Sequence, residues 1–345
     1  MKKKLALIVA LTVVLTLLVS CGGTTEPTSP SESTSTSEGD VPKKVYKVGL
    51  VLPSVINDLS WNQSLYEGAK RLADEGLIEL TYTEGVTPAD AERIFRRYAE
   101  QGFDLVVGHS ATYNDNIFKV AQEFPDINFA NSAGGSRETL DNLAALNQPH
   151  HEPAYLIGML AAGVSKTGKL AGVGALEIPG AKALFKAFEL GAKEINPDIL
   201  VEVVYTGDFV DIAKGKAMAA TLADRGFDFF IPSGDGPARG SIEAARDKQV
   251  YATGFMMDMS PLAPTAVLTS LWWDGEQALR QIIADIEAGT FRPAKYYHGG
   301  VADGVYVPYI NPNLSNLIPA DVLKKMQSRQ EEIISGQFEV PFIVD

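Results

Sequence analysis

The chain has 345 residues, of which 46% are hydrophobic and 21% are charged, and its formal net charge is −13. This length suits about two domains, and the composition is that of a globular protein, which excludes general disorder and a membrane protein with many spans. The acidic charge disfavours nucleic-acid binding, because a negative surface repels phosphates. The single cysteine excludes an intrachain disulfide and a four-cysteine zinc site.

The extreme N-terminus has the pattern of an export signal. Lys2–Lys4 precede the apolar run 5–19, which is short for a helix that spans a bilayer. The run ends in LVSCG at residues 18–22, which resembles the lipobox of bacterial lipoproteins. That resemblance implies a signal peptide over residues 1–20 and lipidation of Cys21. The alternative is an ordinary signal peptide or membrane anchor in which the cysteine is incidental.

A polar segment follows the cysteine. Residues 22–40 hold five Ser and five Thr, together with Pro and Glu, and no apolar anchor. Such a segment cannot bury enough surface to offset its chain entropy, so we expect residues 21–44 to form a flexible tether. A lipid and a tether before the folded part predict a protein outside the cytoplasm, anchored to the membrane but not spanning it.

Two series of alternating strands and helices begin at residue 45. In the first series we expect strands at Tyr46–Leu52, Ile78–Tyr82, Leu105–Val107 and Ile127–Ala130, and helices at Trp61–Glu75, Ala89–Gln101 and Asn114–Phe124. In the second we expect strands at Leu170–Leu176, Leu200–Tyr205, Phe227–Ile231 and Val250–Phe255, and helices at Gly180–Ile195, Ile212–Arg225 and Ala238–Asp247. Ser60 and Gln63 have the spacing of a capping box at the start of the first helix.

This alternation predicts an α/β fold in which mostly parallel sheets are flanked by helices. Two series of similar size predict two similar lobes. We expect the first lobe to comprise residues 45–147 and 272–292, and the second to comprise residues 148–271 and 293–345. Ligands of open α/β sheets bind beyond the carboxyl ends of the strands, so we expect a ligand cleft between the lobes.

The loops after the strands hold the candidate site residues. Trp61 and Phe209 come from opposite lobes and could stack a planar ligand between them. We expect hydrogen-bonding groups from Asn57, Asp58, Asn62, Ser110, Tyr113, Asn131, Asp211, Asp235 and Asp258. Of the pair Trp272 and Trp273, we expect one to pack the link between the lobes and Trp272 to line the cleft. The alternatives are core packing for each aromatic ring and a helix-start carboxylate for each acid.

No catalytic or cofactor motif emerges from the sequence. His109 lies in a candidate cleft loop, but no cysteine and no G-x-S-x-G motif accompanies it. His150 and His151 lie at the link between the lobes, and adjacent histidines point in different directions on most backbones. The chain has neither a Walker A motif nor a dinucleotide-binding fingerprint. We therefore expect no enzyme activity, no cofactor and no metal site.

Several segments resemble the basic membrane lipoprotein (BMP) family, also called the purine nucleoside receptor family. Residues 57–64 read NDLSWNQS and precede Glu67-Gly68, which is similar to the family segment N-D-x-S-F-N-x-x-x-x-E/D-G. Further similar segments lie at residues 102–108, 124–129, 152–158, 165–169, 196–198, 205–211 and 214–216. These segments run in family order over nearly the whole chain after the tether.

The resemblance implies a lipid-anchored solute receptor of an ABC importer with the two-lobed type I periplasmic-binding fold. Its expected partners are a small solute and the permease subunits, and we expect a monomer. The family sandwiches a purine between two aromatic rings, which correspond to Trp61 and Phe209, and Asp58 and Asn62 fall in its first motif. The remaining alternatives are a sensor or surface lipoprotein that binds another polar solute, such as a sugar, and a nucleoside hydrolase.

Two departures from the family leave the ligand open between a purine base and a nucleoside. Nucleoside-binding members carry an aspartate early in the first loop, where this chain reads Leu52-Pro53-Ser54. They also carry G-V-D-x-D in the second lobe, where residues 254–258 read GFMMD. If those acids hold the ribose hydroxyls, two acceptors are missing here. The segment from Asp258 to Trp273 and the tryptophan at position 61 resemble a branch associated with purine bases.

Overall fold

The computed structural model describes residues 44–132, 140–291 and 296–345. The predicted signal peptide over residues 1–20, Cys21 and the tether up to residue 43 lie outside the described residues. Within the part that the structure describes, no helix is both long enough and apolar enough to cross a bilayer.

The first sheet has the strand order β11-β5-β4-β3-β1-β2, and all its pairs are parallel. Its strands are β1 (Tyr46–Val51), β2 (Ile78–Thr83), β3 (Leu105–Gly108), β4 (Asn128–Ser132), β5 (Leu143–Asn147) and β11 (Tyr296–His298). Its helices are α1 (Trp61–Asp74), α2 (Pro88–Glu100), the short η1 (Ala111–Tyr113), α3 (Asn114–Glu123) and α8 (Gly275–Glu287). Strand β3 is buried throughout, because Val106 faces the core under α2 and α3 whereas Val107 faces the core under α1.

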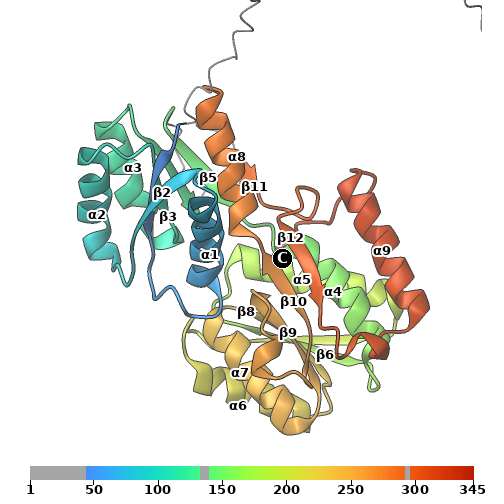
Figure 1. Cartoon of the computed structure of the whole chain (residues 1–345). Coiled ribbons are helices and arrows are strands. Elements are labelled where there is room, and N and C mark those ends of the chain that lie inside the picture. The colour runs from blue at the N-terminus through green and yellow to red at the C-terminus, as the bar shows by residue number, and fades with distance from the viewer. Residues whose placement is uncertain (1–43, 133–139, 292–295) are drawn as a thin grey trace, which may run out of the picture. The chain divides into compact units, whose positions relative to one another are not determined.

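The second sheet has the order β12-β10-β9-β8-β6-β7, and only β12 runs antiparallel among its described pairs. Its strands are β6 (Lys169–Gly174), β7 (Leu200–Tyr205), β8 (Phe229–Ser233), β9 (Tyr251–Met256), β10 (Val267–Trp273) and β12 (Tyr306–Ile310). Its helices are α4 (His151–Val164), α5 (Pro179–Ile195), α6 (Ile212–Asp224), α7 (Asp235–Lys248) and α9 (Ala320–Ile334), with short η2 (Ser260–Leu262) and η3 (Ser315–Leu317). Helix α4 packs against α5 and α9, and α6 packs against α7 (Figure 1).

This architecture confirms the predicted α/β fold of two mostly parallel sheets flanked by helices. Every strand and helix that was predicted by periodicity is present, with ends that differ by a few residues. The prediction did not include a further set of elements, which are β5, α4, β10, α8, β11, β12 and α9.

Within the described residues the chain passes between the two sheets three times. The first crossing is residues 148–150, the second is Asp274, and the third is residues 299–305. Hydrogen bonds tie the crossings together, because Gly299 donates to the Asn147 carbonyl (3.1 Å) and Asp274 donates to the Val305 carbonyl (2.8 Å). The three passages therefore form one bundle of backbone.

Two predicted boundaries between the lobes differ from this topology. Residues 272 and 273, assigned to the first lobe, end β10 and pair with β12 in the second sheet. Residues 296–298, assigned to the second lobe, form β11 and pair with β5 in the first sheet. The physical reason is that β11 has only three residues, so its membership of a sheet depends on a distant pairing partner rather than on a local pattern.

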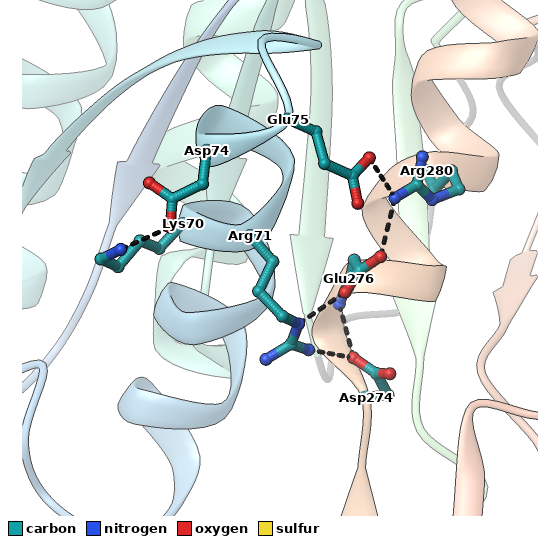
Figure 2. A network of polar contacts seen from close by, with 7 residues as sticks. All are labelled: Lys70, Arg71, Asp74, Glu75, Asp274, Glu276 and Arg280. Atoms are coloured by element: carbon teal, nitrogen blue, oxygen red, sulfur yellow. Dashed lines mark hydrogen bonds and ion pairs between the residues drawn. The ribbon is translucent and has the colours of Figure 1, made fainter.

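Helix α8 holds the second crossing against α1. A Cβ atom at Gly68 would lie 2.2 Å from the backbone nitrogen of Glu276, so the two helices approach closely only because this position is glycine. Arg71 of α1 donates to Asp274 (2.6 Å) and Glu276 (2.5 Å), and Arg280 donates to Glu276 (2.7 Å), as Figure 2 shows. Asp274 also accepts from the backbone N–H of Glu276 (3.0 Å). This network fixes the crossing to one face of α1.

Candidate ligand-binding site

Asp58 determines how α1 begins. Its Oδ1 accepts from the backbone N–H groups of Ser60 (2.9 Å) and Gln63 (3.1 Å), and its Oδ2 accepts from the backbone (3.0 Å) and side-chain amide (2.6 Å) of Asn62. The carboxylate thus satisfies N–H groups that the helix leaves free. The predicted capping box is wrong, because the Ser60 side chain makes no cap hydrogen bond and Gln63 accepts from the N–H of Leu59 (2.9 Å).

The hydroxyl of Ser60 joins the two sheets instead. It is fully buried and donates to the carbonyl oxygen of Phe255 in β9 (3.3 Å). The residues adjacent to the two partners, Leu59 and Met256, have φ angles of 60° and 66°. A side chain in this left-handed region costs roughly 1–2 kcal/mol. Backbone strain on both sides of one contact between the sheets is typical of a functional site.

Trp61 and His109 hold each other at the carboxyl end of the first sheet. Trp61 is the first residue of α1, and His109 directly follows β3. The indole Nε1 donates to the carbonyl oxygen of His109 (2.8 Å), and the imidazole Nε2 lies 2.8 Å from the carbonyl oxygen of Trp61. The rings stack with centroids 4.4 Å apart and 19° between their planes. His109 covers one face of the indole, so the accessible part of Trp61 lies away from it.

A third ring extends this stack. The indole of Trp273, the last residue of β10, is 6.0 Å from the His109 ring at 20°. The Nδ1 atom of His109 lies 2.7 Å from the Ser132 hydroxyl. Because the Trp61 carbonyl can only accept, Nε2 carries the proton and Nδ1 accepts from Ser132. Burial lowers the pKa of His109 to about 4, although the Trp61 carbonyl and Asp58 partly oppose this, so the ring is neutral at pH 7.

Asp235, the first residue of α7, faces the start of α1 from the second sheet. Burial raises the pKa of Asp235 to about 6 and nearby Asp58 adds to the effect, whereas the hydroxyl of Ser60 and the backbone of Trp61 oppose it. Its Oδ1 atom is buried and has no hydrogen-bond partner within the described residues. A buried carboxylate oxygen without a donor is costly and suits an N–H or O–H group of a ligand.

Phe209 reaches the same region from the loop after β7. Asp208 accepts from the backbone N–H groups of the two residues after Phe209 (2.7 and 3.2 Å), which fixes the turn. The Phe209 carbonyl accepts from the N–H of Gly236 (2.7 Å), and its ring is 46% exposed. A Cβ atom at Gly234 would lie 3.5 Å from this ring. The exposed ring therefore lies beside the turn that carries Asp235.

Trp61, through its backbone, and Phe209, through its position beside Gly234, thus lie near Asp235 and come from different sheets. No ring contact joins the two aromatic side chains to each other among those found in the described residues. The predicted sandwich of a planar ligand between them therefore stays a prediction.

His150, in the first crossing, adds a second buried imidazole. Its Nδ1 is hydrogen-bonded to the hydroxyl of Tyr306, and its ring lies 6.4 Å from that of Trp61 and 5.6 Å from that of Phe255. Burial, with a contribution from neighbouring His151, lowers the pKa of His150 to about 3. The two imidazoles near Trp61, His109 and His150, are therefore both neutral at pH 7. His150 itself belongs to the first crossing.

Two predicted site residues lie on the face of the first sheet that packs against α2 and α3, which is opposite to the face covered by α1. Tyr113 is fully buried beside Phe95, and its hydroxyl donates to the Val86 carbonyl (2.6 Å). The amide of Asn131 donates to Asn114 at the start of α3 (2.6 Å). The structure does not bring either side chain to the indole at the start of α1.

Other predicted polar residues stabilise local turns. Ser110 accepts from the N–H of Thr112 (3.2 Å), and exposed Asp211 caps α6 by accepting from the N–H of Lys214 (2.9 Å). Asp258 accepts from the backbone N–H two residues later (2.9 Å). For Asp211 this geometry matches the alternative of a helix-start carboxylate.

The two adjacent tryptophans point in opposite directions, as successive strand residues must. Trp273 is fully buried beside His109, whereas Trp272 is 38% exposed and packs edge-on against Tyr309 at 5.7 Å. The structure thus places Trp273 rather than Trp272 beside the stacked rings. Asn57 is exposed in the loop before α1.

Sequence reasoning noted four residues of this region but did not include them among the predicted site residues. They are Ser60, His109, His150 and Trp273. His109 and Trp273 directly follow or end a strand at its carboxyl end, which is the available sequence signal, but their partners are far away in the sequence. Within the described ranges, no group of three or more His, Cys, Asp or Glu side chains could hold a metal ion.

Comparison with known proteins identifies a family. A family model described as "ABC transporter substrate-binding protein PnrA-like" (Bmp) matches residues 45–343. The chain is 31% identical over 299 residues to a purine-binding protein of Brucella abortus, covering 84% of this chain and 81% of that protein. It is 28% identical over 324 residues to a putative ABC transporter glucose-binding protein of Haloferax volcanii, covering 92% and 79%.

Solved structures agree with this assignment. An ABC transporter solute-binding protein from Conexibacter woesei has a TM-score of 0.74 and 27% identity, covering 87% of this chain and all of that chain. A solute-binding protein of an ABC transporter system from Aeropyrum pernix has a TM-score of 0.75 at 21% identity, covering 86% and 94%, and this similarity concerns the fold alone.

Proposed function

Because this chain belongs to the Bmp family of PnrA-like ABC transporter substrate-binding proteins, we propose that it captures a purine, as base or nucleoside, and delivers it to the permease of its importer. Substrate-binding proteins of ABC importers work outside the cytoplasm and hand a small molecule to membrane subunits.

The convergence of Trp61 and Phe209 on Asp235 carries the proposal. The backbone of Trp61 interacts with the Asp235 carboxylate from the first sheet, and the exposed Phe209 ring lies beside Gly234, which directly precedes Asp235 in the second. Stacking of a base on an aromatic side chain contributes about 1–3 kcal/mol per base. The carboxylate is an acceptor for ring N–H or amino groups of a purine. The purine-binding relative from Brucella abortus adds support from sequence similarity.

A binding series with the full chain in detergent tests the ligand. The probes are adenine, guanine, hypoxanthine, the corresponding nucleosides and glucose, followed by calorimetry and thermal shift. A ligand at 100 times its dissociation constant stabilises the folded state by about 2.7 kcal/mol. We expect stabilisation by at least one purine. A response to glucose alone would contradict the proposal and favour the sugar-binding alternative, which the name of the Haloferax volcanii relative motivates.

Substitutions locate the binding. We expect Trp61→Ala and Phe209→Ala each to weaken purine binding by about 5- to 150-fold, which corresponds to the loss of one stacking contact. Tyr82→Ala is the matched control, because Tyr82 is similarly exposed (40%) on the edge strand β2, where it packs against Tyr66. Binding that is unchanged in both site variants would refute the proposed stacking, whatever the ligand.

Membrane attachment through Cys21 is a separate part of the proposal. It is supported by the basic start, the short apolar run and the lipobox-like residues 18–22. Cells supplied with an alkyne-labelled fatty acid should label the wild-type chain, and Cys21→Ala should abolish that label. Equal labelling of both chains would exclude lipidation at this position.

A further inference from the structure

We propose that His109 is a positioning residue of the binding site, which holds the indole of Trp61 in the orientation that stacks on the ligand. Through Trp273, the same imidazole joins that indole to the second crossing between the sheets. This inference rests on the proposed function, because it assigns a role to Trp61 as the platform for a planar ligand.

Three contacts between the same two residues fix the indole. The Nε1 of Trp61 donates to the backbone of His109 (2.8 Å), and the imidazole Nε2 donates to the backbone of Trp61 (2.8 Å). The rings also stack at 4.4 Å. The first hydrogen bond restricts rotation of the indole in its own plane, and the stack restricts its tilt. Both hydrogen bonds end on backbone carbonyls, so neither acceptor has the freedom of a flexible side chain.

The contacts of His109 use three features of a neutral imidazole. The side chain must donate from one end, accept from the Ser132 hydroxyl at the other end (2.7 Å), and be flat enough to stack. Phenylalanine would stack but leave the buried Ser132 hydroxyl without its acceptor. Glutamine would keep the donor and the acceptor but would replace the aromatic ring by a smaller planar amide. Leucine would supply none of these features.

The stack also connects the site to the crossings. Trp273 lies 6.0 Å from His109 and directly precedes Asp274, which Arg71 holds against α1 (Figure 2). Helix α1 is therefore attached near both ends, through the Trp61 ring at its start and through Arg71 near its end. A ligand that stacks on Trp61 would therefore contact one end of the stack formed by Trp61, His109 and Trp273. The other end of this stack, Trp273, adjoins the second crossing.

The test compares two substitutions of His109 in the full chain. We expect His109→Leu to weaken binding of the tightest purine of the series roughly tenfold, and His109→Gln to remain within about threefold of the wild type. Tyr98→Phe is the matched control: Tyr98 is buried on α2, which packs on the same sheet, and the variant loses one hydrogen bond, to Thr83 (2.7 Å), away from the stack. We expect it to lower the melting temperature without changing purine affinity.

A spectroscopic readout separates positioning from general stability. The near-ultraviolet circular dichroism of Trp61 is obtained as the difference between wild type and Trp61→Phe. We expect this signal to be lost in His109→Leu and retained in His109→Gln. Should the leucine variant fail to fold, Ser132→Ala removes the hydrogen bond to Nδ1 alone, and we expect it to reduce both the signal and the affinity.

The outcomes distinguish this inference from the proposed function. Unchanged purine affinity and an unchanged Trp61 signal in His109→Leu would overturn the positioning role while the proposed function stands. Equal loss in the leucine and glutamine variants would also overturn it, because retained hydrogen bonds should rescue the orientation. If the wild type binds no purine, the proposed function fails, and the Trp61 signal alone decides whether His109 orients the ring.

Discussion

Replacement of Asp235 by asparagine should stabilise the protein and impair its binding. Burial raises the pKa of this carboxyl from 3.8 to about 6, so the folded state holds a proton that the unfolded chain releases between these two pH values. The difference of about two pH units, at 1.36 kcal/mol each, makes the ionised carboxylate cost roughly 3 kcal/mol of stability. That cost is fully present above pH 6, declines as the pH falls towards 3.8, and is absent below it.

Denaturant unfolding of the full chain measures this cost. Without ligand, Asp235→Asn should raise the free energy of unfolding by up to about 3 kcal/mol at pH 7.5, and the gain should nearly vanish at pH 4. Asp211→Asn is the control, because Asp211 is an exposed helix cap that asparagine can replace. A gain that is equal at both pH values, or no gain at pH 7.5, would refute the assignment of a buried, ionised carboxylate.

The same substitution should reduce purine affinity. A hydrogen bond to a charged group contributes about 1.5–3 kcal/mol, so we expect Asp235→Asn to weaken binding about 10- to 150-fold. Wild-type affinity should also fall as the pH drops below about 6, because the protonated carboxyl is a poorer acceptor, and the variant should lack this dependence. Calorimetry at pH 7.5 and pH 5 checks both expectations. A more stable but less functional variant is the usual result of removing a strained binding group.

Three other predictions concern the framework of the site. Gly68→Ala should lower the free energy of unfolding by about 1–3 kcal/mol, because the new Cβ would meet the backbone of α8, whereas Gly180→Ala, where the Cβ has open space, should not; denaturant unfolding compares them. Tyr306→Phe should remove the hydrogen bond to His150 and cost about 1–3 kcal/mol by the same assay. Because burial lowers the pKa of His109 to about 4, its contribution to stability should fall as the pH drops from 6.5 towards 4, and an Asp235→Asn background should expose this fall in a pH series of melting curves.

Three of the elements that periodicity did not predict lack a usable local pattern. Helix α4 is buried at all but three of its fourteen positions, so it has no polar stripe to reveal its period. Strand β11 is too short to alternate visibly, and its place in the first sheet depends on pairing with β5. Strand β10 is buried at six of its seven positions, including Thr269 and Ser270, so its sequence does not alternate between apolar and polar residues.

The loops that the sequence proposes for the site remain a prediction, and a local pattern could not choose among the neighbouring side chains in them. Asp58 and Ser60 are both good helix caps, and only the contact of Ser60 with Phe255, 195 residues away, shows which one is free for another role. Trp272 and Trp273 differ by one strand position, and the register of β10 in its sheet decides which of them lies beside the rings at the end of β3. Such choices depend on long-range contacts that a local pattern does not contain.

The start of α1 combines a helix cap, a hydrogen bond to the second sheet and a stacked aromatic ring in four consecutive residues, 58–61. Because Asp58 caps the helix, Ser60 is free to bond the second sheet, and Trp61 follows immediately with its ring held by His109. Asp235 faces these same residues, and one oxygen of its carboxylate has no hydrogen-bond partner in the part of the chain that the structure describes. A ligand that satisfies this oxygen and stacks on the indole would stabilise the contact between the sheets at the point where it is strained. Solute capture and the closed arrangement of the two sheets would then favour each other, as a substrate-binding protein of an ABC importer requires for its permease to distinguish the loaded form.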